Sequence, residues 1–361
     1  MNVQQQALYD RQIATWLLVC AAVIFGMILL GGVTRLTGSG LSMVEWRPLM
    51  GIIPPLSEAA WLDVFEKYKQ YPEYQKVNLG MDLAGFKVIF MYEYLHRVLG
   101  RLIGTLYFVP FAYFLWKGMV RPDMKARLWL LFVLGGLQGL LGWYMVKSGL
   151  VDNPRVSQYR LTSHLGLAFA IYAYMIWLAL DLLTSRGERT ELRWGGMATW
   201  SAILVGLVYL MILTGGLVAG TRAGFAYNTW PLMGTSFIPD MVYSGASAWR
   251  DAFEDITTIQ FNHRMFAYIL SAMIVATAIS VYRSRYAGGA RRAVSLLLLA
   301  LAGQVVLGIS TLLLHVPISL AAAHQGGAVV LLSAVIYFAH VMLRHADAVK
   351  EALPELRPRI V

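Results

Sequence analysis

The sequence has 361 residues, of which 58% are hydrophobic and only 14% charged, and its mean hydropathy is +0.58. A soluble globular enzyme carries about 25% charged residues, so this composition excludes that class, and it excludes intrinsic disorder as well. The formal net charge of +10 does not indicate nucleic acid as a partner, because such binding needs a basic patch on a water-facing fold.

Eight apolar stretches are each long enough to cross a bilayer as a helix. They lie at residues 13–33, 90–116, 128–146, 161–180, 198–219, 261–282, 293–314 and 316–343. No A-x-A cleavage site follows the first stretch, so we expect it to be retained rather than removed as a secretory signal. The sequence therefore predicts an all-α polytopic membrane protein.

The charges of the connecting segments predict the orientation. On the side of the amino terminus, sixteen Lys and Arg residues stand beside eight Asp and Glu, whereas the other side has 14 basic and 12 acidic residues. Because basic residues concentrate in cytoplasmic loops, we expect both termini in the cytoplasm. The outer side then holds two long loops, 34–89 and 220–260, and loops of this length are usually functional.

The chain repeats itself. LLGGVTRLTGSG from Leu29 aligns with LTGGLVAGTRAG from Leu213, and EYLHRVLGRLIG from Glu93 aligns with QFNHRMFAYILS from Gln260. Three shorter pairs align in the same order: RPLMG with WPLMG, LGGLQGLLG with LAGQVVLG, and SHLGLA with AHQGGA. We predict two tandem four-helix bundles, residues 1–185 and 186–361, related by a pseudo-twofold axis along the membrane normal.

Four histidines occupy equivalent places in the two copies. His96 and His164 correspond to His263 and His324, with offsets of 167 and 160 residues, and all four lie near the outer ends of even-numbered spans. Two imidazoles per bundle are the ligand set of one haem iron with both axial positions filled. Zinc or non-haem iron fits less well, because no carboxylate set accompanies each pair.

A single histidine inside a membrane more often makes a helix–helix hydrogen bond, but four in register favour ligands. The three others have no partner in the repeat, and we interpret His315, His340 and His345 as loop, inner-interface and tail residues.

Glycines follow three of the four histidines and are predicted to leave room for a planar macrocycle: Gly100, Gly104, Gly166, Gly326 and Gly327. The single cysteine, Cys20, excludes an intramolecular disulfide.

The two halves differ beside the first histidine. Glu93 precedes His96 by one turn on the same helical face, whereas the equivalent position in the second half is Gln260. An ionisable residue near hydrocarbon is costly, so Glu93 is a functional candidate. The alternative is a carboxylate paired at the outer interface with Arg97 or Arg101.

Five arginines are candidates to hold haem propionates, because a guanidinium matches a carboxylate in a bidentate fork. They follow the first histidine of each half or the first span of each half: Arg97, Arg101, Arg264, Arg35 and Arg222. The alternative is that they extend to the membrane interface as solvated side chains.

These residues together resemble the haem A synthase family, membrane enzymes that oxidise haem O to haem A for cytochrome oxidase. The resemblance spans nearly the whole chain. Its most specific pieces are GSGLSMVEWRPLMGIIPP at 38–55, FEKYKQYPEYQKVNLGM at 65–81, EYLHRVLGR, QYRLTSHLG, AGTRAGFAYNTWPLM, NHR and AHQGGA. The first two resemble the mitochondrial and proteobacterial branch. Some bacterial members carry a cysteine pair in an outer loop, and this chain does not.

The resemblance implies a role for each half. His96 and His164 would flank the substrate, haem O, and His263 and His324 would ligate a retained haem B. Glu93 would be the important acid, either handling protons or tuning the substrate iron. The C8 methyl of haem O would be oxidised to an alcohol and then to a hydrated aldehyde, which loses water to leave a formyl group.

The resemblance also implies a location and partners. The protein would lie in the cell inner membrane with its haem sites near the outer side. Its partners would be the haem O synthase that supplies substrate, cytochrome oxidase assembly factors, an unidentified electron donor and the lipid bilayer.

Two other functions are open. A di-haem cytochrome b that only transfers electrons would use the same four histidines, but it gains nothing obvious from Glu93 opposite Gln260. A transporter built from two repeats usually places its ionisable groups near the bilayer midplane, whereas here they cluster at the outer ends.

Overall fold

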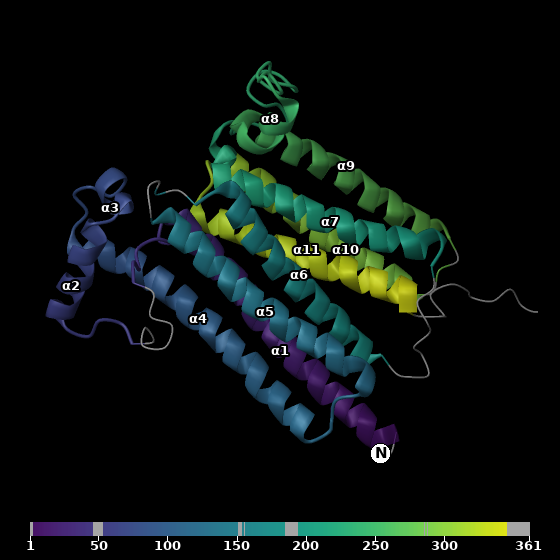
Figure 1. The fold of residues 1–361 in the computed structure, drawn as a ribbon. Coiled ribbons are helices and arrows are strands. Elements are labelled where there is room, and N and C mark those ends of the chain that lie inside the picture. Colours follow the sequence, from purple (N-terminus) through teal and green to yellow (C-terminus); the bar gives the residue numbers. More distant parts are fainter. Residues whose placement is uncertain are drawn as a thin grey trace, which may run out of the picture.

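The computed structural model describes residues 3–45, 53–150, 154, 156–184, 194–284, 286 and 288–344. These residues form eleven α-helices and one 3-10 helix, η1 (Ala223–Phe225), and include no β-strand. Eight helices are long and apolar enough to cross a membrane (Figure 1): α1 (Val3–Leu36), α4 (Leu83–Trp116), α5 (Pro122–Gly149), α6 (Gln158–Leu183), α7 (Gly196–Thr221), α9 (Ile256–Arg283), α10 (Gly288–Leu313) and α11 (Ile318–Arg344). The prediction of an all-α protein with eight spans is confirmed.

Several helices start before the apolar stretch that predicts them, because polar caps set their first residues. Asp82 precedes α4, and its Oδ1 accepts a hydrogen bond of 2.8 Å from the amide of Gly85. Asp255 precedes α9, and its Oδ2 accepts one of 2.7 Å from the amide of Thr258. Each cap satisfies a backbone N–H that the helix itself leaves unpaired, so the helix can extend past the apolar window.

The two long loops predicted for the outer side contain short helices that were not predicted from the sequence. They are α2 (Glu58–Lys69), α3 (Pro72–Lys76) and α8 (Ala248–Glu254), and all three lie at the end of the bundle opposite the start of α1 (Figure 1). Phe65 and Tyr68 of α2 pack on Phe86 of α4, with ring centroids 4.9 and 5.0 Å apart. We call α2, α3 and the first turns of α4 the outer cap.

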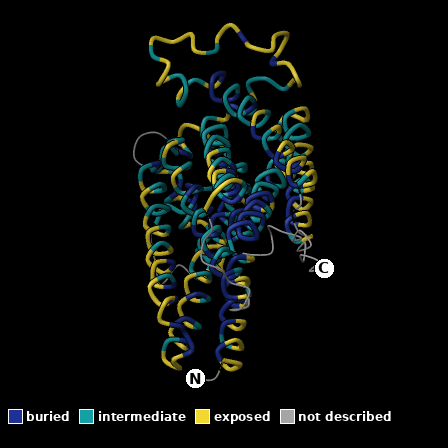
Figure 2. Tube along the Cα trace, turned by 90° about the vertical axis from the view of Figure 1, so that its right-hand side faces the viewer, coloured by how far each residue is buried: buried dark blue, intermediate teal, exposed yellow. Residues whose placement is uncertain are grey.

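The spans pack in the same pattern in each half. In the first half α1 contacts α4 and α6, and α5 contacts α4 and α6. In the second half α7 contacts α9 and α11, and α10 contacts α9 and α11. Helices α1, α6, α7 and α11 make the contacts between the halves. Buried residues accordingly gather in the middle of the bundle, whereas the outward faces of the peripheral helices are exposed (Figure 2).

Contacts between the halves occur in equivalent pairs. A Cβ on Gly166 of α6 would lie 2.7 Å from Leu213 of α7, and a Cβ on Gly326 of α11 would lie 2.9 Å from Leu29 of α1. These two glycines therefore permit close helix packing, and the expectation that they make room for a macrocycle is wrong. Paired contacts suit two related bundles, but the tandem arrangement itself stays a prediction.

Three features predicted from the sequence lie outside the described residues. They are the RPLMG motif at 47–51, the boundary between the predicted bundles at 185 and 186, and His345. His315 lies in the turn between α10 and α11, as predicted.

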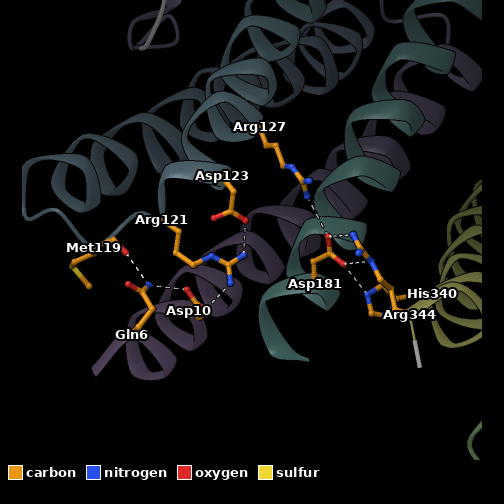
Figure 3. A network of polar contacts seen from close by, with 9 residues as sticks. All are labelled: Gln6, Asp10, Met119, Arg121, Asp123, Arg127, Asp181, His340 and Arg344. Carbon is orange, nitrogen blue, oxygen red and sulfur yellow. Dashed lines mark hydrogen bonds and ion pairs between the residues drawn. The ribbon is translucent and has the colours of Figure 1, made fainter. Parts of the chain in front are cut away.

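Buried ion pairs lie at the end of the bundle where α1 begins (Figure 3). Arg121 donates to Asp10 at 3.0 Å and ties the start of α5 to α1. Asp181 of α6 accepts hydrogen bonds from Arg127, His340 and Arg344 at 3.2 to 3.3 Å. His340 is only 1% exposed, so the residue predicted for the inner interface joins α11 to α6 in the protein interior.

We expect Asp181→Asn to destabilise the protein by about 3 to 5 kcal/mol, because it leaves buried cationic groups without their carboxylate. The measurement is the thermal midpoint of the purified protein in detergent. Asp123→Asn is the matched control, because Asp123 also binds an arginine but its side chain is 57% exposed. If Asp181→Asn and Asp123→Asn lower the thermal midpoint by the same amount, the prediction is contradicted.

Candidate functional site

In the first half, each of the two predicted histidines packs against a glycine of a neighbouring helix. A Cβ on Gly31 of α1 would lie 3.0 Å from Cε1 of His96, and a Cβ on Gly142 of α5 would lie 2.9 Å from Cε1 of His164. Both substitutions would push the imidazole away. The glycines thus leave the space that these two rings occupy.

The second half repeats this arrangement. A Cβ on Gly215 of α7 would lie 3.4 Å from Cε1 of His263, and a Cβ on Gly308 of α10 would lie 2.8 Å from Cε1 of His324. The four glycines that hold the imidazoles are therefore not the ones chosen from the sequence, which follow the histidines on the same helices. These four glycines could have been identified from the sequence, because all four lie in stretches that align between the two copies of the repeat.

The structure brings the histidines together in the predicted pairs. His164 contributes to the electrostatic field at His96, and His324 contributes to the field at His263. Each pair comes from two helices of one half, α4 and α6 in the first and α9 and α11 in the second.

The buried imidazoles have unused hydrogen-bonding capacity. Within the described residues, Nδ1 of His96, His164 and His324 is buried and has no hydrogen-bond partner. An unpaired buried polar atom costs about 1 to 3 kcal/mol and needs an explanation such as a ligand. Paired imidazoles on glycine surfaces fit a haem that lies between two helices of each half.

Glu93 lies beside His96 but is fully occupied by other partners. Its Oε2 accepts from the hydroxyl of Ser42 and the amide of Met43, both at 2.7 Å, and its Oε1 accepts from Arg97 at 2.5 Å. The carboxylate is only 3% exposed. All three partners are donors, so this side chain anchors the segment after α1 to α4. The ion pair with Arg97, which the sequence left open as the alternative to a functional acid, is present.

The second half has a corresponding anchor with opposite hydrogen-bond polarity. Gln260 donates from Nε2 to the carbonyl of Tyr227 at 3.1 Å, and Arg264 donates to the same carbonyl at 2.9 Å. Tyr227 aligns with Met43 in the repeat, whose carbonyl accepts from Arg97 at 2.9 Å. The first loop thus places the backbone N–H of Met43 at Glu93, whereas the second loop places the backbone C=O of Tyr227 at Gln260. A carboxylate can accept from the N–H and an amide can donate to the C=O, which explains an acid in one half and an amide in the other.

The five candidate arginines divide into two groups. Arg97 and Arg264 bind carbonyls of the outer loops, as described above, and Arg101 lies near Arg97 on α4. Arg35 and Arg222, at the ends of α1 and α7, lie close enough to repel each other. In the described part of the chain neither of these two side chains makes a hydrogen bond or ion pair. Two adjacent guanidinium groups without carboxylates suit an anion.

Comparison with known proteins identifies the family. Residues 14–336 match the family described as cytochrome oxidase assembly protein. The chain belongs to this family. A haem A synthase of Nitrosospira multiformis is 53% identical over 344 residues, which cover 95% of this chain and 97% of the relative.

Two further relatives in this family carry the same name. The haem A synthase of Nitrosomonas eutropha is 49% identical over 327 residues, covering 90% of this chain and 92% of the relative. That of Paramagnetospirillum magneticum is 49% identical over 338 residues, covering 91% and 93%. The resemblance stated from the motifs is confirmed.

The outer cap contains a buried carboxyl that the sequence analysis missed. Glu73 of α3 is 6% exposed, and its Oε2 accepts a hydrogen bond of 3.2 Å from the hydroxyl of Tyr68. Burial, opposed by the hydrogen bond from Tyr68 and reinforced by the charge of Glu93, raises the pKa of Glu73 to about 8. Burial likewise raises the pKa of Tyr68 above its ordinary value. At neutral pH the cap therefore encloses a protonated carboxyl.

We expect the outer cap to lose stability as the pH rises. The Glu73 carboxyl has a pKa of about 8 when folded and an ordinary value of about 4.3 when unfolded, so the folded state binds the proton more tightly between these values. Stability is greatest below about pH 4 and falls by about 2 kcal/mol between about pH 6 and pH 8. Hydrogen exchange of the α2 and α3 amides, corrected for intrinsic rates, measures this change.

Glu73→Gln should abolish this pH dependence, because an amide has no proton to lose. Glu66→Gln is the control, since Glu66 lies on the same cap with its side chain 62% exposed and paired with Lys69. If the stability of the outer cap still depends on pH in Glu73→Gln, the pH dependence arises from another group.

An apolar hollow lies between α5 and α6. It has a volume of about 460 Å³ and is lined only by apolar side chains of α5 and α6: Leu137, Leu140, Leu141, Trp143, Tyr144 and Leu167.

Proposed function

We propose that the protein is a haem A synthase, a membrane oxidoreductase that converts haem O to haem A for cytochrome oxidase. The observation that carries this proposal is the pair of histidines in each half, each imidazole packed on a glycine, in a chain similar to haem A synthases over nine-tenths of its length or more.

The two halves have different tasks in this proposal. Residues 1–185 form a bundle that binds haem O between His96 and His164, and residues 186–361 form a bundle that holds haem B through His263 and His324. Support comes from the difference between Glu93 and Gln260, because a substrate site and a cofactor site need different surroundings. When bound, haem B supplies a redox-active iron.

The protein's own residues position the substrate rather than carry out the oxidation. The C8 methyl of haem O would undergo two two-electron oxidations, to an alcohol and then to a hydrated aldehyde, and each needs an oxidant and an oxygen atom from outside the protein. Loss of water from the hydrated aldehyde then leaves the formyl group. Glu93 and Arg97 hold the outer segment over His96, which keeps the porphyrin edge in place and limits access of water. The propionates bind Arg35 and Arg222, whose guanidinium groups are adjacent and free of carboxylate partners in the described part of the chain.

The proposed setting is the cell inner membrane, with both termini in the cytoplasm and the haem sites near the outer side. The excess of sixteen basic over eight acidic residues on the side of the termini supports this orientation. The proposed partners are a haem O synthase that delivers the substrate, assembly factors of cytochrome oxidase, and an electron donor.

The test is the haem content of the purified protein after co-expression with a haem O synthase, determined by solvent extraction and chromatography. We expect haem B together with haem O, a hydroxylated intermediate or haem A. Two molecules of haem B per chain and no other haem would instead indicate an electron-transferring cytochrome. No haem at all would reject both functions and favour a transporter.

A further inference from the structure

One hydrogen bond distinguishes the two halves at the first histidine. Thr214 Oγ1 lies 2.8 Å from Nδ1 of His263. Leu30 occupies the equivalent position in the first half, directly before Gly31, and cannot form such a bond. In the described part of the chain Nδ1 of His96 is buried and has no partner.

The direction of this bond follows from the second contact of the threonine. The hydroxyl of Thr214 donates its only proton to the carbonyl of Met211 at 2.8 Å. Its oxygen is therefore the acceptor toward His263, whose Nδ1 must carry the proton. The lone pair of that imidazole is then on Nε2, the nitrogen that is left to bind a metal.

Such a bond strengthens a metal ligand. A histidine that donates from its second ring nitrogen is fixed in orientation and is more basic, and loss of the acceptor typically costs 10- to 100-fold in affinity, an order of magnitude or two. His164 and His324 do not differ in this way, since Nδ1 of each lacks a partner among the described residues. Among the four histidines, a hydrogen bond to Nδ1 therefore distinguishes only His263, and Thr214 in place of Leu30 provides it.

We infer that Thr214 is a positioning residue that makes His263 a tight haem ligand, and that Leu30 leaves His96 a weaker one. This inference rests on the proposed function. The second half then retains its haem B through many turnovers. The first half must accept haem O and release haem A, and a weaker axial bond permits that exchange.

The experiment compares variants that keep the side-chain shape and change only the hydroxyl. Haem B release is measured by transfer to excess apomyoglobin, together with the midpoint potential of haem B. Thr214→Val should release haem B about 10 to 100 times faster. Its midpoint potential should rise, because a less basic imidazole stabilises ferric iron less. Thr214→Ser keeps the acceptor and should restore both values.

The reciprocal variant tests the other half and does not depend on the folding of Thr214→Val. Leu30→Thr should slow release of haem O or haem A from the first half by about tenfold or more, whereas Leu30→Val should not. The inference is overturned if Thr214→Val matches the native protein in release and potential, or if Leu30→Thr behaves like Leu30→Val.

Failure of the proposed function gives a different result. If His263→Ala retains haem B at the native level, the ligand assignment is wrong and this inference falls with it. If His263→Ala loses haem B but Thr214→Val does not release it faster, the proposed function stands and only the role of Thr214 is rejected.

Discussion

His263→Ala will yield a protein that lacks haem B but still forms its first haem site. The ring of His263 packs on Gly215 and is oriented by Thr214, so no other side chain at that position can replace the ligand. The first site draws its histidines from α4 and α6 and does not need α9. The measurement is the ratio of each extracted haem to protein, and we expect haem B to fall from about one per chain to a small fraction.

The matched variants make this result specific. His96→Ala should keep haem B, lose the bound substrate haem and form no haem A. His315→Ala should change neither haem, because His315 lies exposed in the turn between α10 and α11. If either His263→Ala or His96→Ala loses both haems while its helical content is unchanged, the prediction of two separate haem sites is contradicted.

Glu93→Gln will lower both stability and haem A formation, the latter by at least about tenfold. The amide nitrogen cannot accept from Arg97, so a guanidinium whose side chain is 11% exposed loses its counter-charge. Breaking a buried ion pair on one side typically costs about 3 to 5 kcal/mol. Arg97→Met should cost a similar amount, because it leaves the carboxylate of Glu93 unpaired.

The double variant separates positioning from proton chemistry. When both charges are removed, no buried charge is left unpaired, and we expect Glu93→Gln with Arg97→Met to regain part of the lost stability. If Glu93 acts by anchoring the loop, haem A formation should recover in parallel. Recovery of the thermal midpoint without recovery of haem A would contradict the anchoring role. Glu66→Gln, in the exposed pair with Lys69, is the control and should change neither quantity.

The histidines of the candidate site could be predicted from the sequence, whereas most of the contacts around them could not. The histidine pairs follow from the sequence because a duplication preserves their spacing, and His164 lies near His96 and His324 near His263 in the structure. Their role as haem ligands stays a prediction. The glycines were misassigned because sequence shows neighbours on one helix, whereas Gly31 and Gly142 contact histidines of other helices. The helices of the outer cap were missed because their sequence lacks the long apolar stretch that marks a span.

By itself the amino-acid sequence determined that the chain crosses a membrane eight times, that it is duplicated and that four histidines are in register. A bilayer requires apolar segments of a set length, and such segments are visible in one dimension. Only the tertiary structure decided the contacts of Glu93 and Thr214. Glu93 binds Ser42, 51 residues away, and Thr214 binds His263, 49 residues away. These partners meet only when separate helices pack, because the depth and rotation of each helix determine which polar groups come within hydrogen-bond distance.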